Sequence, residues 1–327
     1  MKAIWWLAAL MVLAGCVGEG DFSELVPDTV VDDPTLPAFE TPDGVQLHLQ
    51  RMGPEDGPTV VVLHGGPGGD FVGLLALQEL KDTHQVIFFD QRGSGLSERL
   101  DPSYITPDEM VADIRAIQQA YSPEEPIALV GHSWGGALAT HYVQHYPDEV
   151  ASLVLAEPAA LNATAAAVAN TTEFRFRSRE LHQMLNSADY LSYDNHHIAD
   201  YQMAVSLSSD VGDYRDFYSP DELKELAFAR FGFMANYAIN DWQGNFDDSW
   251  DYDFADGVRQ DFSGDVLLLA ADHSERLGPD FQRQYHLPLL PESTQFVEIA
   301  EAGHFFLEFN ADQALPEIRA FLDGEEP

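Results

Sequence analysis

The sequence is poor in basic residues and in cysteine. Its 327 residues include 16 lysines and arginines against 55 aspartates and glutamates, so the formal net charge is −39 at pH 7. A surface this acidic repels nucleic acids and anionic lipid headgroups, and we expect neither as a direct partner. The only cysteine, Cys16, excludes an internal disulfide bond. Apart from the N-terminus, no segment is apolar enough to suggest a membrane span.

Two hypotheses account for the acidic composition. Concentrated salt screens the repulsion between like charges, so a protein from a halophile tolerates such a surface. The alternative is an acidic exported protein from an organism that prefers arginine to lysine. The composition agrees with this, because only three of the 16 basic residues are lysines (Lys2, Lys81 and Lys224).

The N-terminus has the pattern of an export signal. Lys2 precedes a short apolar segment, residues 3–12, and Leu13-Ala14-Gly15-Cys16 follows. A run of this length suits a signal peptide, and the four residues that end at Cys16 resemble the lipobox of bacterial lipoproteins. The resemblance implies removal of residues 1–15 and a lipid on the Cys16 thiol. The protein would then be exported and held to a membrane of the bacterial cell envelope, on its periplasmic or outer-surface side. An ordinary secretory signal is the alternative.

The rest of the chain alternates between strand and helix patterns. Strands are expected at 45–50, 59–63, 86–89, 127–130, 151–155, 266–270 and 295–299. One helix is expected to open at 106–109, and others at 134–146, 163–169, 173–185, 221–229 and 312–322. This order predicts an α/β fold with a mostly parallel sheet and helices on both faces. The core would comprise 41–157 and 262–327. We expect a solvated acidic tether at 16–40 and, after the strand at 151–155, a helical cap at 158–261 over the sheet's carboxyl edge.

A Gly-x-Ser-x-Gly motif follows the fourth of these strands. It reads Gly131-His132-Ser133-Trp134-Gly135 and stands where a strand gives way to a helix. In that context the serine lies on a tight turn with its hydroxyl exposed at the positive end of the helix, as a nucleophile requires. A plain structural turn is the alternative.

The sequence supplies partners for such a nucleophile. His304, in a loop after the last strand, is the predicted base, and Asp272, just past the strand at 266–270, is the predicted orienting acid; Asp265 is a weaker rival. The order Ser, Asp, His is the one found in α/β-hydrolases. The glycines of residues 64–69 allow a backbone N–H to approach an oxyanion. We assign this donor to Gly66, with Gly65 as the alternative, and the second donor to the N–H of Trp134.

Three blocks together carry a resemblance to a family. The blocks are residues 64–69 (HGGPGG), 90–97 (DQRGSGLS) and 131–136 (GHSWGG). They resemble the proline iminopeptidase branch of the α/β-hydrolases, closely over residues 40–160 and more loosely over 260–325. The resemblance implies the α/β-hydrolase fold with an eight-stranded sheet. It also implies an activity that releases N-terminal proline, or another residue, from short peptides through an acyl-enzyme.

The cap departs from the family pattern. Family peptidases hold the substrate's free amine with glutamates, one of them in a Glu-Asn-His-Tyr-like stretch, whereas residues 233–237 here read FMANY. Glu157, Asp241 and Asp247 are candidate replacements. The alternatives are therefore a carboxylesterase or another small-molecule hydrolase, and a lipid-anchored binding protein without catalysis. Haloalkane or epoxide chemistry is disfavoured because the resembling families use an aspartate nucleophile. The sequence implies no metal and no organic cofactor.

Overall fold

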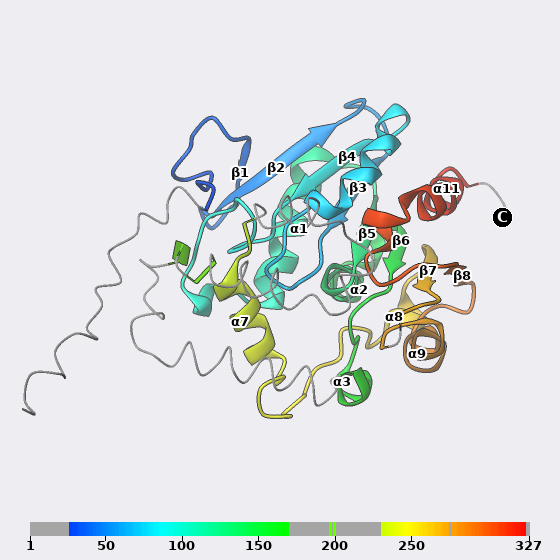
Figure 1. Ribbon diagram of the computed structural model, residues 1–327. Coiled ribbons are helices and arrows are strands. Elements are labelled where there is room, and N and C mark those ends of the chain that lie inside the picture. Colours follow the sequence, from blue (N-terminus) through cyan, green and yellow to red (C-terminus); the bar gives the residue numbers. More distant parts are fainter. Residues whose placement is uncertain (1–25, 170–195, 198, 201–229, 275, 325–327) are drawn as a thin grey trace, which may run out of the picture.

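The fold is built on one eight-stranded sheet (Figure 1). The computed structural model describes residues 26–169, 196–197, 199–200, 230–274 and 276–324. The strand order is β1-β2-β4-β3-β5-β6-β7-β8; β1 and β2 are antiparallel to their neighbours and all other pairs are parallel. The strands are β1 (Ala38–Glu40), β2 (Gln46–Met52), β3 (Thr59–Leu63), β4 (Gln85–Phe89), β5 (Ile127–His132), β6 (Val150–Ala156), β7 (Asp265–Ala271) and β8 (Gln295–Ile299).

The helices are short except for three. The longest helices are α1 (Pro107–Tyr121), α2 (Trp134–His145) and α11 (Ala311–Leu322). The shorter α-helices are α3 (Ala163–Ala169), α7 (Phe233–Trp242), α8 (Val258–Asp261), α9 (Pro279–Phe281) and α10 (Phe306–Phe309). The 3₁₀ helices are η2 (Val72–Asp82), η3 (Pro102–Tyr104), η4 (Pro147–Glu149) and η7 (Leu287–Leu289). The segment η6 (Gln282–His286) is a π-helix.

Both faces of the sheet are covered, so its central strands are apolar throughout. Successive residues of a strand point to opposite faces, and all five residues of β3 and of β4 are buried. One face packs against α1, α2 and α8, with Val61 and Leu129 in that cluster. The other packs against η2, α10 and α11 and includes Val60 and Val130. The two clusters form the hydrophobic core on which the loops at the carboxyl edge rest.

Most sequence-predicted elements are confirmed within one or two residues. Two strands, β3 and β8, have the predicted bounds, and α1 begins after Thr106, whose hydroxyl accepts a hydrogen bond from the Glu109 N–H at 3.2 Å. That bond is the predicted N-cap, which satisfies an N–H left free at the helix start. The alternation of strands and helices therefore predicts the α/β architecture correctly.

The tether prediction is wrong for part of 16–40. Residues 38–40 form β1 and pair with β2, and Val26 and Val30 are buried. The Val30 N–H also donates to the Leu96 carbonyl at 2.9 Å. A short edge strand gives little sequence signal, because three residues show no clear alternation. Cys16 and the predicted signal peptide lie outside the described residues.

The chain between β6 and β7 contains the predicted helical insert. Its described parts include α3, α7 and α8, and α7 contacts the core through Ala235 and Ile239. Two helices expected at 173–185 and 221–229 lie outside the described residues. The boundaries of the cap, 158–261, remain a prediction.

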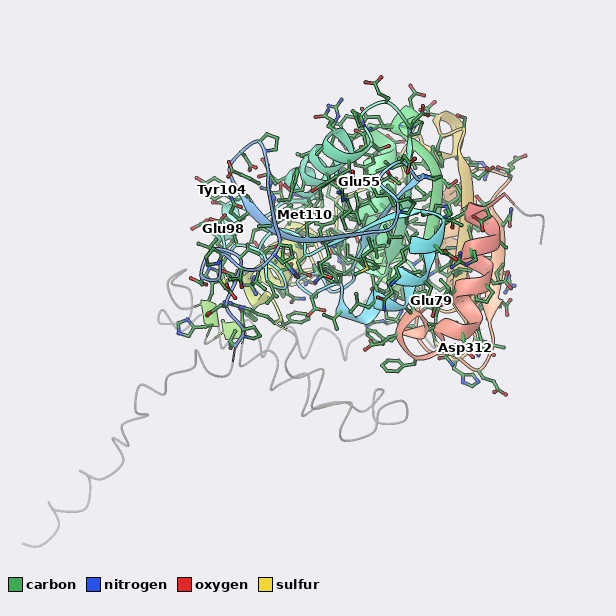
Figure 2. All side chains as sticks on the ribbon, turned by 90° about the horizontal axis from the view of Figure 1, so that it is seen from above. Glu55, Glu79, Glu98, Tyr104, Met110 and Asp312 are labelled. Carbon is green, nitrogen blue, oxygen red and sulfur yellow. The ribbon has the colours of Figure 1, made fainter. Side chains whose placement is uncertain are left out.

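Acidic side chains are spread over the outside of the molecule (Figure 2). Glu55 lies exposed in the loop between β2 and β3, Glu79 on η2 and Asp312 on α11. Within the described part of the chain, no helix has the length and apolar character needed to cross a membrane.

Candidate active site

Ser133 occupies the sharp turn between β5 and α2. Its φ of 54° and ψ of −119° lie outside the regions that most side chains adopt, and such a conformation costs on the order of 1 kcal/mol or more. The flanking glycines make the turn sterically feasible. A Cβ on Gly131 would lie 2.4 Å from the Gly135 carbonyl oxygen, and one on Gly135 would lie 2.1 Å from that of Leu63. The predicted nucleophile turn is present at the start of a helix.

The carboxylate that contacts His304 belongs to Glu157. Its Oε2 lies 2.5 Å from Nδ1 of His304, and its Oε1 accepts the Ala271 N–H at 3.1 Å. The Glu157 side chain is fully buried, whereas the His304 ring is 23% exposed. A carboxylate on Nδ1 fixes the ring so that Nε2 is the free nitrogen, as a general base requires.

The prediction that Asp272 orients His304 is wrong. Its Oδ1 accepts the Ala302 N–H at 3.1 Å and lies 3.9 Å from Nε2 of His273. Burial acts to raise the pKa of Asp272, but the N–H groups of Glu301 and Ala302 outweigh it, so this pKa is lowered. Asp272 therefore holds the backbone just before His304 and leaves the ring to Glu157. The rival Asp265 lies exposed at the opposite, amino end of β7.

The sequence contained one indication of the acid's position. Glu157 directly follows the apolar strand β6, so it is a charged residue at the carboxyl edge of the sheet. The sequence prediction considered it as an amine ligand for the substrate. The hydrogen bond to His304 removes that role, because a buried carboxylate bonded to the ring and to a backbone N–H has little capacity left for an amine.

The glycine loop lies against Ser133. A Cβ on Gly65 would be 3.0 Å from the Ser133 Cβ, closer than most side chains approach, so a glycine suits this contact. Gly66 has a φ of 126° and is followed by a cis peptide bond to Pro67. Among the described residues, no hydrogen bond uses the backbone N–H of Gly66 or of Trp134. Both predicted oxyanion donors are thus available; their role stays a prediction.

The DQRGSGLS block holds the glycine loop in place. Gln91 donates from Nε2 to the His64 carbonyl at 2.8 Å and accepts the Trp134 Nε1–H at 2.9 Å. Its backbone N–H donates to His64 Nε2 at 3.0 Å. His64 therefore carries its proton on Nδ1 and donates to the Gly65 carbonyl at 2.8 Å. One side chain thus ties the loop to the residue after Ser133.

His132 positions the loop of His304. Its Nε2 donates to the His304 carbonyl at 2.7 Å, and the two rings are 4.7 Å apart. Burial, with a further contribution from His304, lowers the pKa of His132 to about 3. The ring is therefore neutral, and it acts as a hydrogen-bond donor rather than as a second base.

The cap contacts the glycine loop at the stretch where the family pattern departs. The Asn236 side chain donates to the Pro67 carbonyl at 2.8 Å, and the Gly232 N–H donates to the Gly68 carbonyl at 2.7 Å. Asn236 thus holds the loop. The other two candidate amine ligands, Asp241 and Asp247, are exposed.

Asp70 follows the glycine loop and has a raised pKa. Burial, together with the charges of Asp90 and Glu308, raises the pKa of the Asp70 carboxyl to about 7, although the Val72 N–H and Arg99 oppose this. The usual aspartate value is about 3.9. A carboxyl group that titrates near neutrality therefore lies beside the candidate site.

The chain belongs to the alpha/beta hydrolase fold family, whose model matches residues 58–311. The proline iminopeptidase PfmaB of Pestalotiopsis fici is 37% identical over 119 residues, which are 35% of this chain and 41% of that relative. The match thus spans about two fifths of the relative's length. An esterase structure from Thermogutta terrifontis has a TM-score of 0.66 at 20% identity and covers 88% of this chain and 97% of its own.

A proline iminopeptidase structure from Mycobacterium smegmatis is similar to the same extent. Its TM-score is 0.61 at 20% identity, covering 88% of this chain and 98% of its own. At 20% identity, the similarity to either structure supports the fold and does not distinguish an esterase from an iminopeptidase. The family match confirms the predicted α/β-hydrolase fold.

Replacing Asp70 with asparagine should stabilise the protein at high pH. Between about pH 4 and 7 the folded state keeps the Asp70 proton that the unfolded chain has lost, so wild-type stability falls as pH rises through this window. Asparagine removes this loss and can still accept the Val72 N–H. We expect the variant to be more stable than the wild type by about 1–3 kcal/mol at pH 8 and by much less near pH 4. Denaturant unfolding at both pH values measures the difference.

The matched control is Asp56→Asn, which removes an equal charge from an exposed position. General relief of the −39 charge would stabilise both variants alike. Equal pH profiles for the two variants would show that Asp70 has no special environment.

Proposed function

We propose that the protein is a serine hydrolase that cleaves amide or ester bonds through an acyl-enzyme. The observation that carries the proposal is the contact between the buried Glu157 carboxylate and His304, next to a serine on a strained strand-to-helix turn. Within the described residues no hydrogen bond joins Ser133 to His304. In structures without substrate such catalytic hydrogen bonds are often long and tighten on binding.

The proposed reaction has two halves. Ser133 Oγ attacks the substrate carbonyl while His304 Nε2 takes the hydroxyl proton, and Glu157 stabilises the imidazolium that forms. The N–H groups of Gly66 and Trp134 bind the oxyanion. His304 then gives its proton to the leaving amine or alcohol, which leaves an acyl-Ser133 ester. Water, deprotonated by His304, hydrolyses this ester and restores the serine.

An iminopeptidase-like aminopeptidase is the leading substrate class. It is supported by the three blocks that resemble that branch and by a relative named as a proline iminopeptidase. Such an enzyme needs a negative group for the substrate's ammonium. Asp70, with Glu308 close enough to influence it, is the candidate that the described residues offer beside the glycine loop. Short peptides with a free N-terminus are then the substrates.

A carboxylesterase is the second candidate, and Asn236 favours it. Residues 233–237 contain no glutamate where the resembling family has an amine-binding one, and Asn236 donates to the Pro67 carbonyl. A neutral side chain engaged in the fold cannot supply the charge that selects an ammonium group. A carboxylesterase would not need such a charge, because its substrates have no ammonium group to bind.

The two acidic residues near His304 should differ sharply in their effect on turnover. Glu157→Gln removes the charge on Nδ1, and we expect kcat to fall by about 10³–10⁴-fold, as when a triad acid becomes an amide. Asp272→Asn keeps an acceptor for the Ala302 N–H and should lose less than about tenfold. Initial rates on p-nitrophenyl acetate and labelling of Ser133 by a fluorophosphonate probe measure both effects.

Ser133→Ala gives the background for both assays. A larger loss in Asp272→Asn than in Glu157→Gln would restore Asp272 as the triad acid. Full turnover by Ser133→Ala would remove the serine mechanism altogether.

A free α-amine separates the two substrate classes. If the enzyme is an aminopeptidase, Pro-p-nitroanilide should be cleaved and its N-acetylated form should lose at least about 100-fold in kcat/KM, because an ammonium in contact with a carboxylate is lost. Asp70→Asn should then raise KM for the free amine without affecting p-nitrophenyl acetate. Equal rates on the free and acetylated amides, or turnover of esters only, would favour the esterase.

We infer that the protein is exported and anchored by a lipid on Cys16. The lipobox-like residues 13–16 support this, as does the position of the only cysteine. When the full gene is expressed in a bacterium, the product should partition into detergent, and its N-terminal peptide should carry acyl chains by mass spectrometry. Cys16→Ser should appear in the aqueous phase. An unmodified N-terminal peptide from wild-type protein would contradict the anchor.

A further inference from the structure

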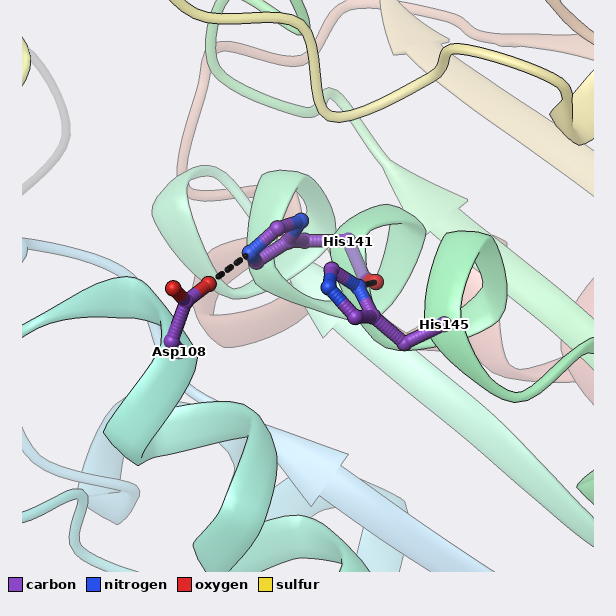
Figure 3. Close-up of side chains that lie close together, drawn as sticks. All are labelled: Asp108, His141 and His145. Atoms are coloured by element: carbon purple, nitrogen blue, oxygen red, sulfur yellow. Dashed lines mark hydrogen bonds and ion pairs between the residues drawn. The ribbon is translucent and has the colours of Figure 1, made fainter.

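Three potential metal ligands meet between α1 and α2, away from Ser133. Asp108 lies in the first turn of α1, and His141 and His145 lie one turn apart on α2 (Figure 3). One ligand atom from each residue lies within 4.8 Å of the other two. His141 is eight residues past Ser133, which corresponds to about 12 Å along a helix. The cluster is therefore separate from the proposed catalytic site.

The hydrogen bonds of His141 orient its Nε2 toward Asp108. Gln144 donates from Nε2 to the Asp253 carbonyl at 3.0 Å, which fixes its amide so that Oε1 faces His141 Nδ1 at 2.9 Å. An amide oxygen only accepts, so His141 carries its proton on Nδ1. The Nε2 of the neutral ring then offers a lone pair toward Asp108 Oδ1, which lies 2.9 Å away and is also an acceptor.

Two acceptors at this distance need a cation between them or a second proton on the ring. The ring is buried, packed against Phe254 with centroids 4.7 Å apart. This packing fixes the ring in place, with Nε2 directed toward Asp108.

His145 is arranged in the same way. Its Nδ1 donates to the His141 carbonyl at 2.9 Å, which leaves Nε2 as the free nitrogen. Histidines that bind metals typically donate their other N–H to a carbonyl or carboxylate, and this fixes the ring and its tautomer. Both histidines of the cluster already have such a partner.

We propose that His141 Nε2, His145 Nε2 and an Asp108 oxygen form a binding site for a divalent transition-metal ion of the zinc type. Two imidazoles and a carboxylate suit Zn²⁺, Co²⁺ or Ni²⁺ rather than Ca²⁺ or Mg²⁺, which prefer oxygen ligands. Ligand atoms around a tetrahedral zinc ion lie about 3.4 Å apart. Asp108 and His145 are exposed, so small rotations of their side chains reach this geometry.

The proposed ion would cross-link α1 and α2, which already contact each other through Asp108 and His141. It would neutralise Asp108 and place positive charge near the C-terminal end of α2, where the helix dipole favours a cation. Since the folded chain holds the ligands together and the unfolded chain does not, binding should stabilise the fold. The acidic surface would raise the local concentration of any divalent cation.

Titration of the metal-stripped full chain tests the site. With Co²⁺ we expect one ion per chain to give the visible absorption of low-symmetry, four- or five-coordinate cobalt, and Zn²⁺ to displace it. One equivalent of Zn²⁺ should raise the melting temperature by several degrees, whereas Ca²⁺ at the same concentration should not. His145→Gln, at an exposed position, should weaken Zn²⁺ binding at least tenfold, and Asp108→Asn should do the same.

His273→Gln and Asp56→Asn are the matched controls, because each removes an exposed group of the same type elsewhere. They should leave the affinity for Zn²⁺ unchanged. Binding that survives both His145→Gln and Asp108→Asn would show that the ion lies elsewhere on the acidic surface and would overturn the proposal. So would Zn²⁺ binding no tighter than that of Ca²⁺, which would leave His141 as a protonated ion-pair partner of Asp108.

Discussion

The hydrogen bond between Glu157 and His304 is the interaction on which the arrangement of the site depends. It joins the loop after β6 to the loop after β8, and the second Glu157 oxygen joins both to the end of β7. The carboxylate is fully buried, and a charge in that position is tolerated only when hydrogen bonds replace the lost water. The three parallel strands must therefore end at fixed relative heights. Their register, such as Leu155 opposite Leu268 and Ala271 opposite Ile299, supplies this.

A second set of contacts holds the other side of the site. Gln91 binds both the glycine loop and the Trp134 side chain, and Asn236 of the cap binds the same loop from outside. His132 holds the backbone of His304. Each of these residues acts through the backbone of a neighbour, so none needs to touch substrate to affect catalysis.

The fold could be predicted from the sequence because its signals are local. Continuous apolar runs at 59–63 and 127–130 identify buried strands, and Thr106-Pro107 identifies a helix start. The nucleophile turn and the glycine loop were also predictable, since both depend on residues close in sequence. β1 was not, because three residues at the edge of a sheet carry too little pattern.

The orienting acid could not be chosen from the sequence with the same certainty. Asp272 and Glu157 both follow strands whose ends lie at the same edge, and chain order favours Asp272 only by analogy with relatives. The choice depends on side-chain direction: Asp272 turns to the Ala302 N–H, while the longer Glu157 reaches the ring. The metal cluster was missed for a related reason, because Asp108 lies 33 residues before His141.

The position of Glu157 has a consequence for how this chain can be recombined with its relatives. The proposed cap begins at the next residue, Pro158, and the Ala159 N–H donates to the Ser133 carbonyl at 2.9 Å. Cap and catalytic acid therefore share one continuous backbone, with no spacer between them. A foreign cap joined at this point would replace the residues that contact the Ser133 backbone. A chimaera that receives a foreign cap should therefore keep residues through Ala159 from this chain. The junction at the other end of the cap, before β7, has no such contact with the proposed triad.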